Sequence, residues 1–222
     1  MKIETLGVFG GESLDCRMTC LLVNDRVALD AGSLSQALSI ERQQAVESIV
    51  LSHSHMDHTT SLPFFVENVF GQVREAVDVH ASAATIYALR KHLFNNDTWP
   101  DFTRLPNHLL PAVRFHELVD ERPVTVGGVR FTPIPVDHLV PTHGFLIEDG
   151  ESAVLWSSDT GPTRRLWEIA NATPHLKAIC LDTSFDNGLQ RVADVSLHLT
   201  PRTLESELRK LERRVPILLH HL

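Results

Sequence analysis

The amino-acid sequence predicts an α/β fold in a single domain. Short apolar runs with the length of β-strands alternate with longer stretches that have the spacing of helices. The chain has 222 residues, of which 43% are hydrophobic, and this is enough apolar material for one core of ordinary size. We therefore expect one domain over residues 1–222, with a loop insertion at about residues 95–111.

The first half of the chain is expected to begin with strands and to continue with helices and strands in alternation. Residues 2–8 alternate in polarity, and residues 19–23 and 26–29 flank Asn24-Asp25 as a hairpin would. The further predicted elements are a helix over residues 35–48, a strand over 49–51, a helix over 62–70, a strand over 77–80 and a helix from Ser82 to about residue 94.

The segment at residues 95–106 lacks regular periodicity and predicts a long functional or lid loop. It is polar but contains aromatic side chains at Trp99 and Phe102. These two rings are expected either to pin the loop against the core or to contact a substrate directly.

The second half is expected to add the remaining strands. Residues 113–116, 124–126 and 129–136 are predicted strands of this half, with Gly127-Gly128 as a hairpin turn. Further strands are expected at residues 153–156, 176–181 and 216–219. Pro162 is placed to open a helix, and Thr200 is placed to cap another over residues 201–213.

A cluster of ionisable residues follows the strand at residues 49–51. In Ser52-His53-Ser54-His55-Met56-Asp57-His58, three imidazoles and one carboxylate lie within six positions, which is costly to bury without a strong partner. His53 and His55 project to one side of an extended segment, while Asp57 and His58 fall where a helix begins. The pattern predicts two adjacent sites for divalent metal ions such as zinc. The alternative is a surface histidine cluster without a ligand.

This motif resembles the H-x-H-x-D-H signature of the metallo-β-lactamase superfamily. The resemblance implies an αββα sandwich, with two mixed sheets flanked by helices and a two-metal site at one sheet edge. It also implies that Asp30, in Asp30-Ala31-Gly32, accepts a hydrogen bond from a metal-bound histidine. The alternative for Asp30 is a residue that only forms a turn.

Later motifs resemble those of the same superfamily and complete the implied site. They occur as Asp137-His138-Leu139-Val140-Pro141, as Ser158-Asp159-Thr160-Gly161-Pro162, and as the terminal His221-Leu222. The resemblance implies His53, His55 and His138 on one ion, Asp57, His58 and His221 on the other, and Asp159 bridging both. It assigns no role to His143 or His220.

The helix ending before Asn95, followed by W-P-D-F-T-x-L-P, resembles the class II cyclic-nucleotide phosphodiesterases within this superfamily. This resemblance implies a metal-dependent phosphodiesterase that converts 3′,5′-cyclic AMP or GMP to the 5′-nucleotide through a metal-bridging hydroxide. His198, oriented by Asp182, is the expected proton donor, and Asp57 is expected to hold the proton of the hydroxide. Relatives carry glutamate where this chain has Asp182, so the shorter arm is expected to hold His198 less firmly.

Other functions remain open on the sequence alone. A nuclease that processes the 3′ end of tRNA shares all seven ligands. The resemblance implies that this branch of the superfamily carries a long RNA-gripping arm between the motifs that contain Gly144 and Asp159 here, whereas this sequence has only a short interval between them. A lactam or thioester hydrolase has the same metal chemistry. A closed zinc site in a non-enzyme is disfavoured because seven ligands across two ions leave positions open to solvent.

Composition sets further expectations. The net charge of −8 disfavours binding of long nucleic acid, and a small phosphodiester is the expected partner. Three cysteines without zinc-finger spacing, no secretory signal and no membrane span predict a cytoplasmic protein. The metals are expected to be Zn²⁺, with Mn²⁺ or Fe²⁺ as alternatives. Apolar residues around Trp99 allow a homodimer, and relatives usually continue beyond the position of Leu222.

Overall fold

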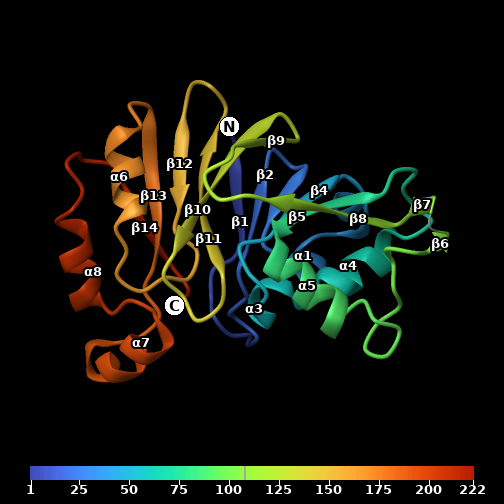
Figure 1. Ribbon diagram of the computed structural model, residues 1–222, viewed down its shortest axis with the longest axis horizontal. Helices are drawn as coiled ribbons and strands as arrows, with labels where there is room; N and C mark the ends of the chain where they lie inside the picture. Colours follow the sequence, from blue (N-terminus) through green and yellow to red (C-terminus); the bar gives the residue numbers. More distant parts are fainter. Residues whose placement is uncertain (108) are drawn as a thin grey trace. The chain divides into compact units, whose positions relative to one another are not determined.

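The computed structural model describes residues 1–107 and 109–222 (Figure 1). The chain divides into two compact units, an N-terminal unit of Lys2–Leu118 and a C-terminal unit of Val119–Leu222 together with Met1. The prediction of a single domain over residues 1–222 stays a prediction. Within the described residues, every helix is too short or too polar to cross a lipid bilayer.

The N-terminal unit contains a mixed sheet. Among its described residues, the strand order is β1 (Ile3–Gly7), β2 (Cys20–Val23), β3 (Val27–Leu29), β4 (Ser48–Val50), β5 (Val77–Ser82) and β8 (Val113–Leu118). The first three strands pair antiparallel, and β3, β4, β5 and β8 pair parallel. Asn24 and Asp25 have φ of 50° and 60°, as the predicted tight hairpin requires.

The prediction from the sequence placed one strand in the wrong half of the chain. Residues 113–116 were expected among the strands of the second half, but β8 pairs with β5 at the edge of the N-terminal sheet. The physical reason is that a short apolar strand carries no local signal for its partner. The helix and the loop between β5 and β8 form the connection that a parallel pair of strands needs.

The helices of the N-terminal unit are α1 (Leu34–Ala37), α2 (Ile40–Gln44), α3 (Met56–Thr59), α4 (Leu62–Val69) and α5 (Ala83–His92). The single helix expected over residues 35–48 is instead the pair α1 and α2. Leu38 is extended, and the Ser39 side chain accepts from the Arg42 backbone nitrogen, so a new helix begins there. Ser82 caps α5 as predicted, accepting from the Thr85 nitrogen.

The core of the N-terminal unit lies between its sheet and the helices α1, α4 and α5. Ile49 and Val79 face this core from the strands, and Leu34 and Phe65 face it from the helices. Every residue of β2, β3 and β4 is buried, whereas in β5 the buried Val77, Val79 and Ala81 alternate with partly exposed residues.

The loop that follows α5 is pinned to this core. Phe102 is 2% exposed and belongs to the buried cluster, and its ring stacks edge-on against Phe70 at 5.1 Å. Trp99 packs in the same manner on Phe64 at 5.2 Å. The segment ends in a small hairpin of β6 (Pro106–Asn107) and β7 (Leu110–Pro111). Of the two roles left open for the aromatic residues, these contacts support packing against the core.

The C-terminal unit contains a second mixed sheet. Among its described residues, the strand order is β14 (Ile217–His220), β13 (Leu176–Asp182), β12 (Ala153–Trp156), β11 (Thr142–Glu148), β10 (Val129–Val136) and β9 (Val124–Val126). Strands β9 to β12 form antiparallel pairs, and β12, β13 and β14 are parallel. The sequence patterns did not predict β11. The strand begins with the polar residues Thr142 and His143, and its apolar residues follow only after them.

The helices of this unit are α6 (Arg165–Ala172), α7 (Gln190–Ser196) and α8 (Pro201–Leu208), with a 3₁₀ turn at Asn187–Leu189. Pro162 precedes α6 by three positions instead of opening it, and α8 ends at Leu208, short of the expected residue 213. Thr200 and Thr203 cap α8 reciprocally. Trp167 from α6 and Leu204 from α8 pack with Ile134 and Leu155 of the strands in the core of this unit.

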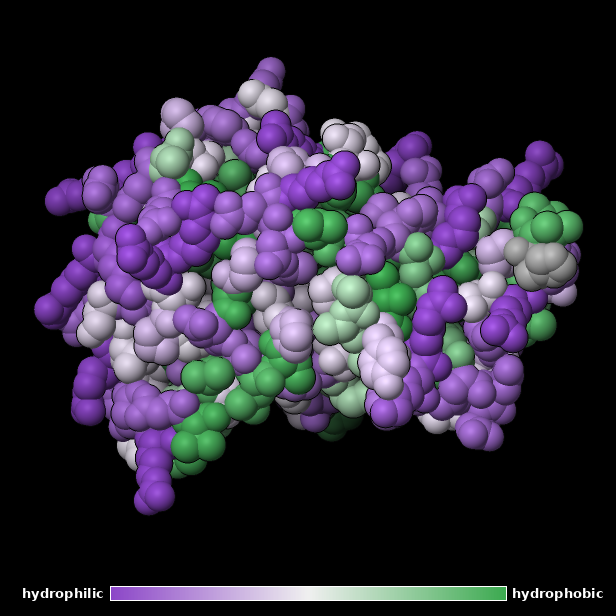
Figure 2. Space-filling model, in the orientation of Figure 1, coloured by the Kyte–Doolittle hydropathy of each residue, from purple (hydrophilic) through white to green (hydrophobic). Residues whose placement is uncertain are grey.

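Helix α7 was not predicted, and it carries apolar side chains on its outer side. Val192 and Val195 in α7, and Leu189 just before it, are at least 46% exposed, and Figure 2 shows apolar atoms at the lower left over this helix. Their outward orientation removes the buried stripe by which a sequence pattern would have revealed the helix. The homodimer expected from the sequence stays a prediction.

Replacing Phe102 by alanine should destabilise the protein by about 3 to 5 kcal/mol, because a fully buried ring is removed from a packed core. Urea unfolding followed by circular dichroism measures the change. Tyr87→Ala, at a ring that is 63% exposed, is the matched control and should cost about 0.5 kcal/mol. Equal effects of the two substitutions would show that the loop is not anchored by Phe102.

Candidate functional site

Parallel pairing in the N-terminal unit brings two of the sequence motifs together. Asp30 follows β3, and Ser52 to His58 follow β4, so both segments leave the same edge of the sheet. The Asp30 nitrogen donates to the Val50 carbonyl at 2.8 Å, and the Ala31 nitrogen donates to the His58 carbonyl at 2.8 Å. A Cβ atom on Gly32 would lie 1.9 Å from the Asp57 carbonyl oxygen. Glycine is therefore required where the two segments touch.

The histidines of this segment lie against one another. The His53 ring centroid is 4.6 Å from that of His55 and 4.2 Å from that of His58. His53 and His58 are fully buried, whereas His55 and Asp57 are partly exposed. Asp57 and His58 lie in the short helix α3, and an Asp57 carboxylate oxygen is 3.4 Å from His58 Nε2. The four predicted ligands of this unit therefore form one group.

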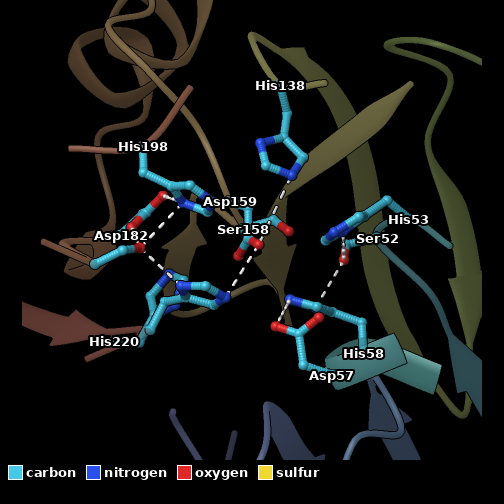
Figure 3. A network of polar contacts seen from close by, with 12 residues as sticks. Ser52, His53, Asp57, His58, His138, Ser158, Asp159, Asp182, His198 and His220 are labelled. Carbon is cyan, nitrogen blue, oxygen red and sulfur yellow. Dashed lines mark hydrogen bonds and ion pairs between the residues drawn. The ribbon is translucent and has the colours of Figure 1, made fainter. Parts of the chain in front are cut away.

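Asp30 fixes the orientation of two of these rings. Its Oδ1 accepts from the Ser52 nitrogen at 2.8 Å, and its Oδ2 accepts from the Ser52 hydroxyl at 2.9 Å and from His58 Nδ1 at 2.8 Å. Ser52 Oγ is also 2.9 Å from His53 Nδ1 (Figure 3). Because the Ser52 proton points to the carboxylate, its oxygen accepts from His53. Both imidazoles then carry hydrogen on Nδ1 and a lone pair on Nε2.

The C-terminal unit gathers its predicted residues in the same way. Strands β10 and β12 are each antiparallel to β11, so they run in one direction, and β13 and β14 are parallel to β12. The segments that leave the carboxyl ends of these strands carry His138, Asp159, Asp182 and His221. These four residues therefore lie at one edge of the sheet, and Figure 3 labels His138, Asp159 and Asp182 among them.

Asp159 lies between two histidines of its unit. The same carboxylate oxygen, Oδ2, is 3.2 Å from His221 Nε2 and 3.9 Å from His138 Nε2. His138 Nδ1 donates to the Leu197 carbonyl at 3.2 Å, so its Nε2 carries the lone pair. Leu197 and His221 have φ of 56° and 60°, in the left-handed region that is strained for these residues.

Asp182 and His198 form a buried pair (Figure 3). The Asp182 Oδ2 atom accepts from His198 Nδ1 at 2.7 Å and from the Thr160 nitrogen at 2.9 Å. Burial raises the pKa of the Asp182 carboxyl from its ordinary 3.8, and the hydrogen bond from His198 opposes this shift. We expected the shorter Asp182 to hold His198 less firmly than a glutamate would. This expectation is wrong, because the hydrogen bond of 2.7 Å between the two side chains is short and charge-assisted. His221 belongs to the same cluster, with ligand atoms of the three residues within 4.8 Å.

Residues 23–221 match the family model described as "Beta-lactamase superfamily domain". The chain belongs to the β-lactamase superfamily. One curated relative is a "Probable 3',5'-cyclic-nucleotide phosphodiesterase" of Yersinia pestis. It is 29% identical to this chain over 264 residues, and the match covers 96% of this chain and 72% of the relative.

Solved structures of other proteins show the same fold. Unliganded yeast PDE1 is 18% identical, with a TM-score of 0.80 over 99% of this chain and 87% of that one. The short form of human tRNase Z is 14% identical, with a TM-score of 0.75 over 100% and 92% of the two chains. At these identities the likeness shows the fold alone. The predicted family and metallo-β-lactamase fold are confirmed, and with them the prediction of a hydrolase.

The side chains of this superfamily member fit a divalent metal site. The predicted donors are imidazole nitrogens and carboxylate oxygens, which is the donor set of zinc and related ions. His53, His58 and His138 each have Nδ1 held by an oxygen, which leaves Nε2 as the basic nitrogen. Metal-binding histidines are oriented by such outer hydrogen bonds. The chemistry of the donors therefore supports divalent metal binding.

Two serines contact predicted site residues, although the sequence motifs did not single them out. Ser52 joins Asp30 to His53, and Ser184 Oγ lies within 2.6 Å of Asp182 Oδ1 and 2.7 Å of His221 Nδ1. Ser184 lies only two residues after the predicted Asp182, but serine is too common in loops to be assigned a contact from spacing alone.

The two histidines left without a role have structural contacts. His143 Nε2 is 2.8 Å from an Asp120 carboxylate oxygen, and the His143 side chain is buried. His220 stacks on Trp156 with ring centroids 3.8 Å apart and contacts the Ser157 hydroxyl at 3.3 Å. His220 is the last residue of β14, whereas His221 lies beyond the strand with φ of 60°, so the alternation of a strand does not extend to His221.

Replacing Asp30 by asparagine should weaken metal binding about tenfold to a hundredfold, because the amide orients His58 less firmly than the carboxylate. Competition with a chromophoric chelator measures the affinity. Asp25→Asn, in the exposed hairpin turn of the same unit, is the matched control and should leave the affinity unchanged. An unchanged affinity in Asp30→Asn would show that Asp30 only shapes the turn.

Proposed function

We propose that the protein is a two-metal phosphodiesterase that hydrolyses 3′,5′-cyclic nucleotides to 5′-nucleotides. The observation that carries this proposal is the match over 96% of the chain to a relative named as a probable phosphodiesterase of that specificity. The Asp182–His198 pair supports it, because cleavage of an unactivated ribose ester requires a proton for the departing oxygen.

The ligand assignment in this proposal follows the order of the sequence motifs. In this assignment, His53, His55 and His138 hold one ion, Asp57, His58 and His221 hold the other, and Asp159 bridges them. The order of the motifs in the sequence and the membership of the superfamily support this assignment. The mutual distances of Asp159, His138 and His221 within the C-terminal unit are compatible with a shared carboxylate.

When bound, two divalent ions would supply a water molecule of lowered pKa and positive charge for the phosphate. The residues of the chain have separate tasks in the proposed reaction. Asp57 accepts the proton of the attacking water, and His198 donates a proton to the ribose oxygen that leaves phosphorus. Asp182 holds the Nδ1 hydrogen of His198, so that Nε2 is the atom that exchanges the proton.

The nuclease alternative is less well supported. The interval between Gly144 and Asp159 is occupied by the hairpin of β11 and β12, whose turn is closed by the Asp149 carboxylate accepting from the Glu151 and Ser152 nitrogens. The net charge of −8 also disfavours a long polyanion. A lactam or thioester hydrolase has no feature in its favour among these observations.

Substrate specificity tests the proposed function directly. Zinc-loaded protein should convert cyclic AMP or cyclic GMP to the 5′-monophosphate, as measured by chromatography, and His55→Ala should remove this activity. A precursor tRNA and a chromogenic cephalosporin should remain intact. Release of mature tRNA, or turnover of the cephalosporin with no turnover of cyclic nucleotide, would replace the proposed function by the corresponding alternative.

The role of His198 is tested by changing the leaving group. His198→Ala should lower kcat for cyclic nucleotide roughly a hundredfold to ten-thousandfold, because the ribose oxygen leaves only with a proton. Hydrolysis of bis(p-nitrophenyl) phosphate should fall far less, since nitrophenolate leaves without one. His175→Ala, at a partly exposed histidine that contacts Glu148, is the control and should change neither rate. Equal losses on both esters would contradict proton donation by His198.

A further inference from the structure

We infer that Ser184 is a positioning residue that holds His198 and His221 through a single hydroxyl group. Its Oγ is 2.6 Å from Asp182 Oδ1, 2.7 Å from His221 Nδ1 and 3.0 Å from His198 Nδ1. The inference rests on the proposed function for the roles of the two histidines, as metal ligand and proton donor. The contacts themselves lie within the C-terminal unit.

The direction of each hydrogen bond follows from the number of hydrogens available. An ionised Asp182 only accepts, so the single hydroxyl hydrogen of Ser184 goes to Oδ1, and 2.6 Å is the length of a charge-assisted bond. The serine oxygen can then only accept from His221 Nδ1. His198 donates chiefly to Asp182 Oδ2, which is closer to its Nδ1 than the serine oxygen is.

This arrangement places a hydrogen on Nδ1 of both imidazoles. His221 then offers the lone pair of Nε2 to a metal, whereas His198 must carry a second hydrogen on Nε2 when it acts as the proton donor. The two rings are parallel to within 14°, with centroids 4.9 Å apart. One hydroxyl therefore ties the orientation of the ligand to the orientation of the proton donor.

Ser184 also explains how a short aspartate serves two histidines. The Oδ2 atom of Asp182 is committed to His198 and to the Thr160 nitrogen, and only Oδ1 remains. The serine hydroxyl extends the reach of Oδ1 to His221. The backbone of Ser184 is itself fixed, because its nitrogen donates to the Leu199 carbonyl at 3.1 Å.

Metal binding tests the link to His221 without reference to any substrate. In Ser184→Ala, the zinc affinity of the full-length protein, measured by chelator competition, should fall about tenfold to a hundredfold. Ser184→Thr keeps a hydroxyl and should restore the affinity.

Kinetics at saturating zinc test the link to His198. Ser184→Ala should lower kcat for cyclic nucleotide about tenfold with little change in KM, and it should affect bis(p-nitrophenyl) phosphate less. Ser184→Thr should recover the lost kcat. Ser184→Cys, which conserves size but hydrogen-bonds weakly, should resemble the alanine variant if the hydroxyl acts through its hydrogen bonds.

The outcomes separate this inference from the proposed function. Unchanged zinc affinity in Ser184→Ala and Ser184→Cys would overturn the inference, whatever the substrate is. Weakened binding that threonine restores would support it even if cyclic nucleotides are not hydrolysed, in which case only the proposed function fails. Weakened binding that threonine does not restore, with equal kinetic losses on both esters, would reduce Ser184 to a packing role and overturn the inference.

Discussion

In each unit the predicted site residues depend on one buried carboxylate, and the two carboxylates are satisfied in the same way. Asp30 accepts from a backbone nitrogen, a serine hydroxyl and a histidine Nδ1, and so does Asp182. A fully buried carboxylate is costly unless several hydrogen bonds stabilise its charge. In each unit the serine oxygen also lies within 2.9 Å of the Nδ1 atom of a second histidine, His53 or His221. The carboxylates thereby fix the tautomers on which metal binding depends.

Parallel strand pairs make this arrangement possible. β3 and β4 run side by side in the N-terminal unit, as β12 and β13 do in the C-terminal unit, and each pair ends at the same sheet edge. A carboxylate after one strand can therefore reach the polar residues after its neighbour. Asp30 reaches the Ser52 nitrogen, and Asp182 reaches the Thr160 nitrogen. Antiparallel neighbours would place these segments at opposite ends of the sheet.

Local signals explain which features the sequence could predict. The H-x-H-x-D-H motif and the strand before it lie within ten residues, so pattern and spacing were sufficient for both. The membership of β8 in the N-terminal sheet depends on a partner more than thirty residues earlier, as the pairing of Val113 with Val77 shows. Helix α7 has exposed apolar residues, which removes the amphipathic signal. The roles of Ser52 and Ser184 depend on where distant chain segments meet, which no local pattern contains.

Position 182, where the resemblance to the phosphodiesterases implied a glutamate, illustrates why one residue cannot be judged apart from its neighbours. A side chain shorter by one methylene suggests a weaker hold on His198 when it is considered alone. In the structure that hydrogen bond is 2.7 Å long, and the Ser184 hydroxyl links the second carboxylate oxygen to His221. What must be preserved is the set of hydrogen bonds that stabilises the carboxylate and sets the histidine tautomers. In this chain the aspartate holds His198 directly and reaches His221 through Ser184, so the length of the acidic side chain cannot be judged without the hydroxyl beside it.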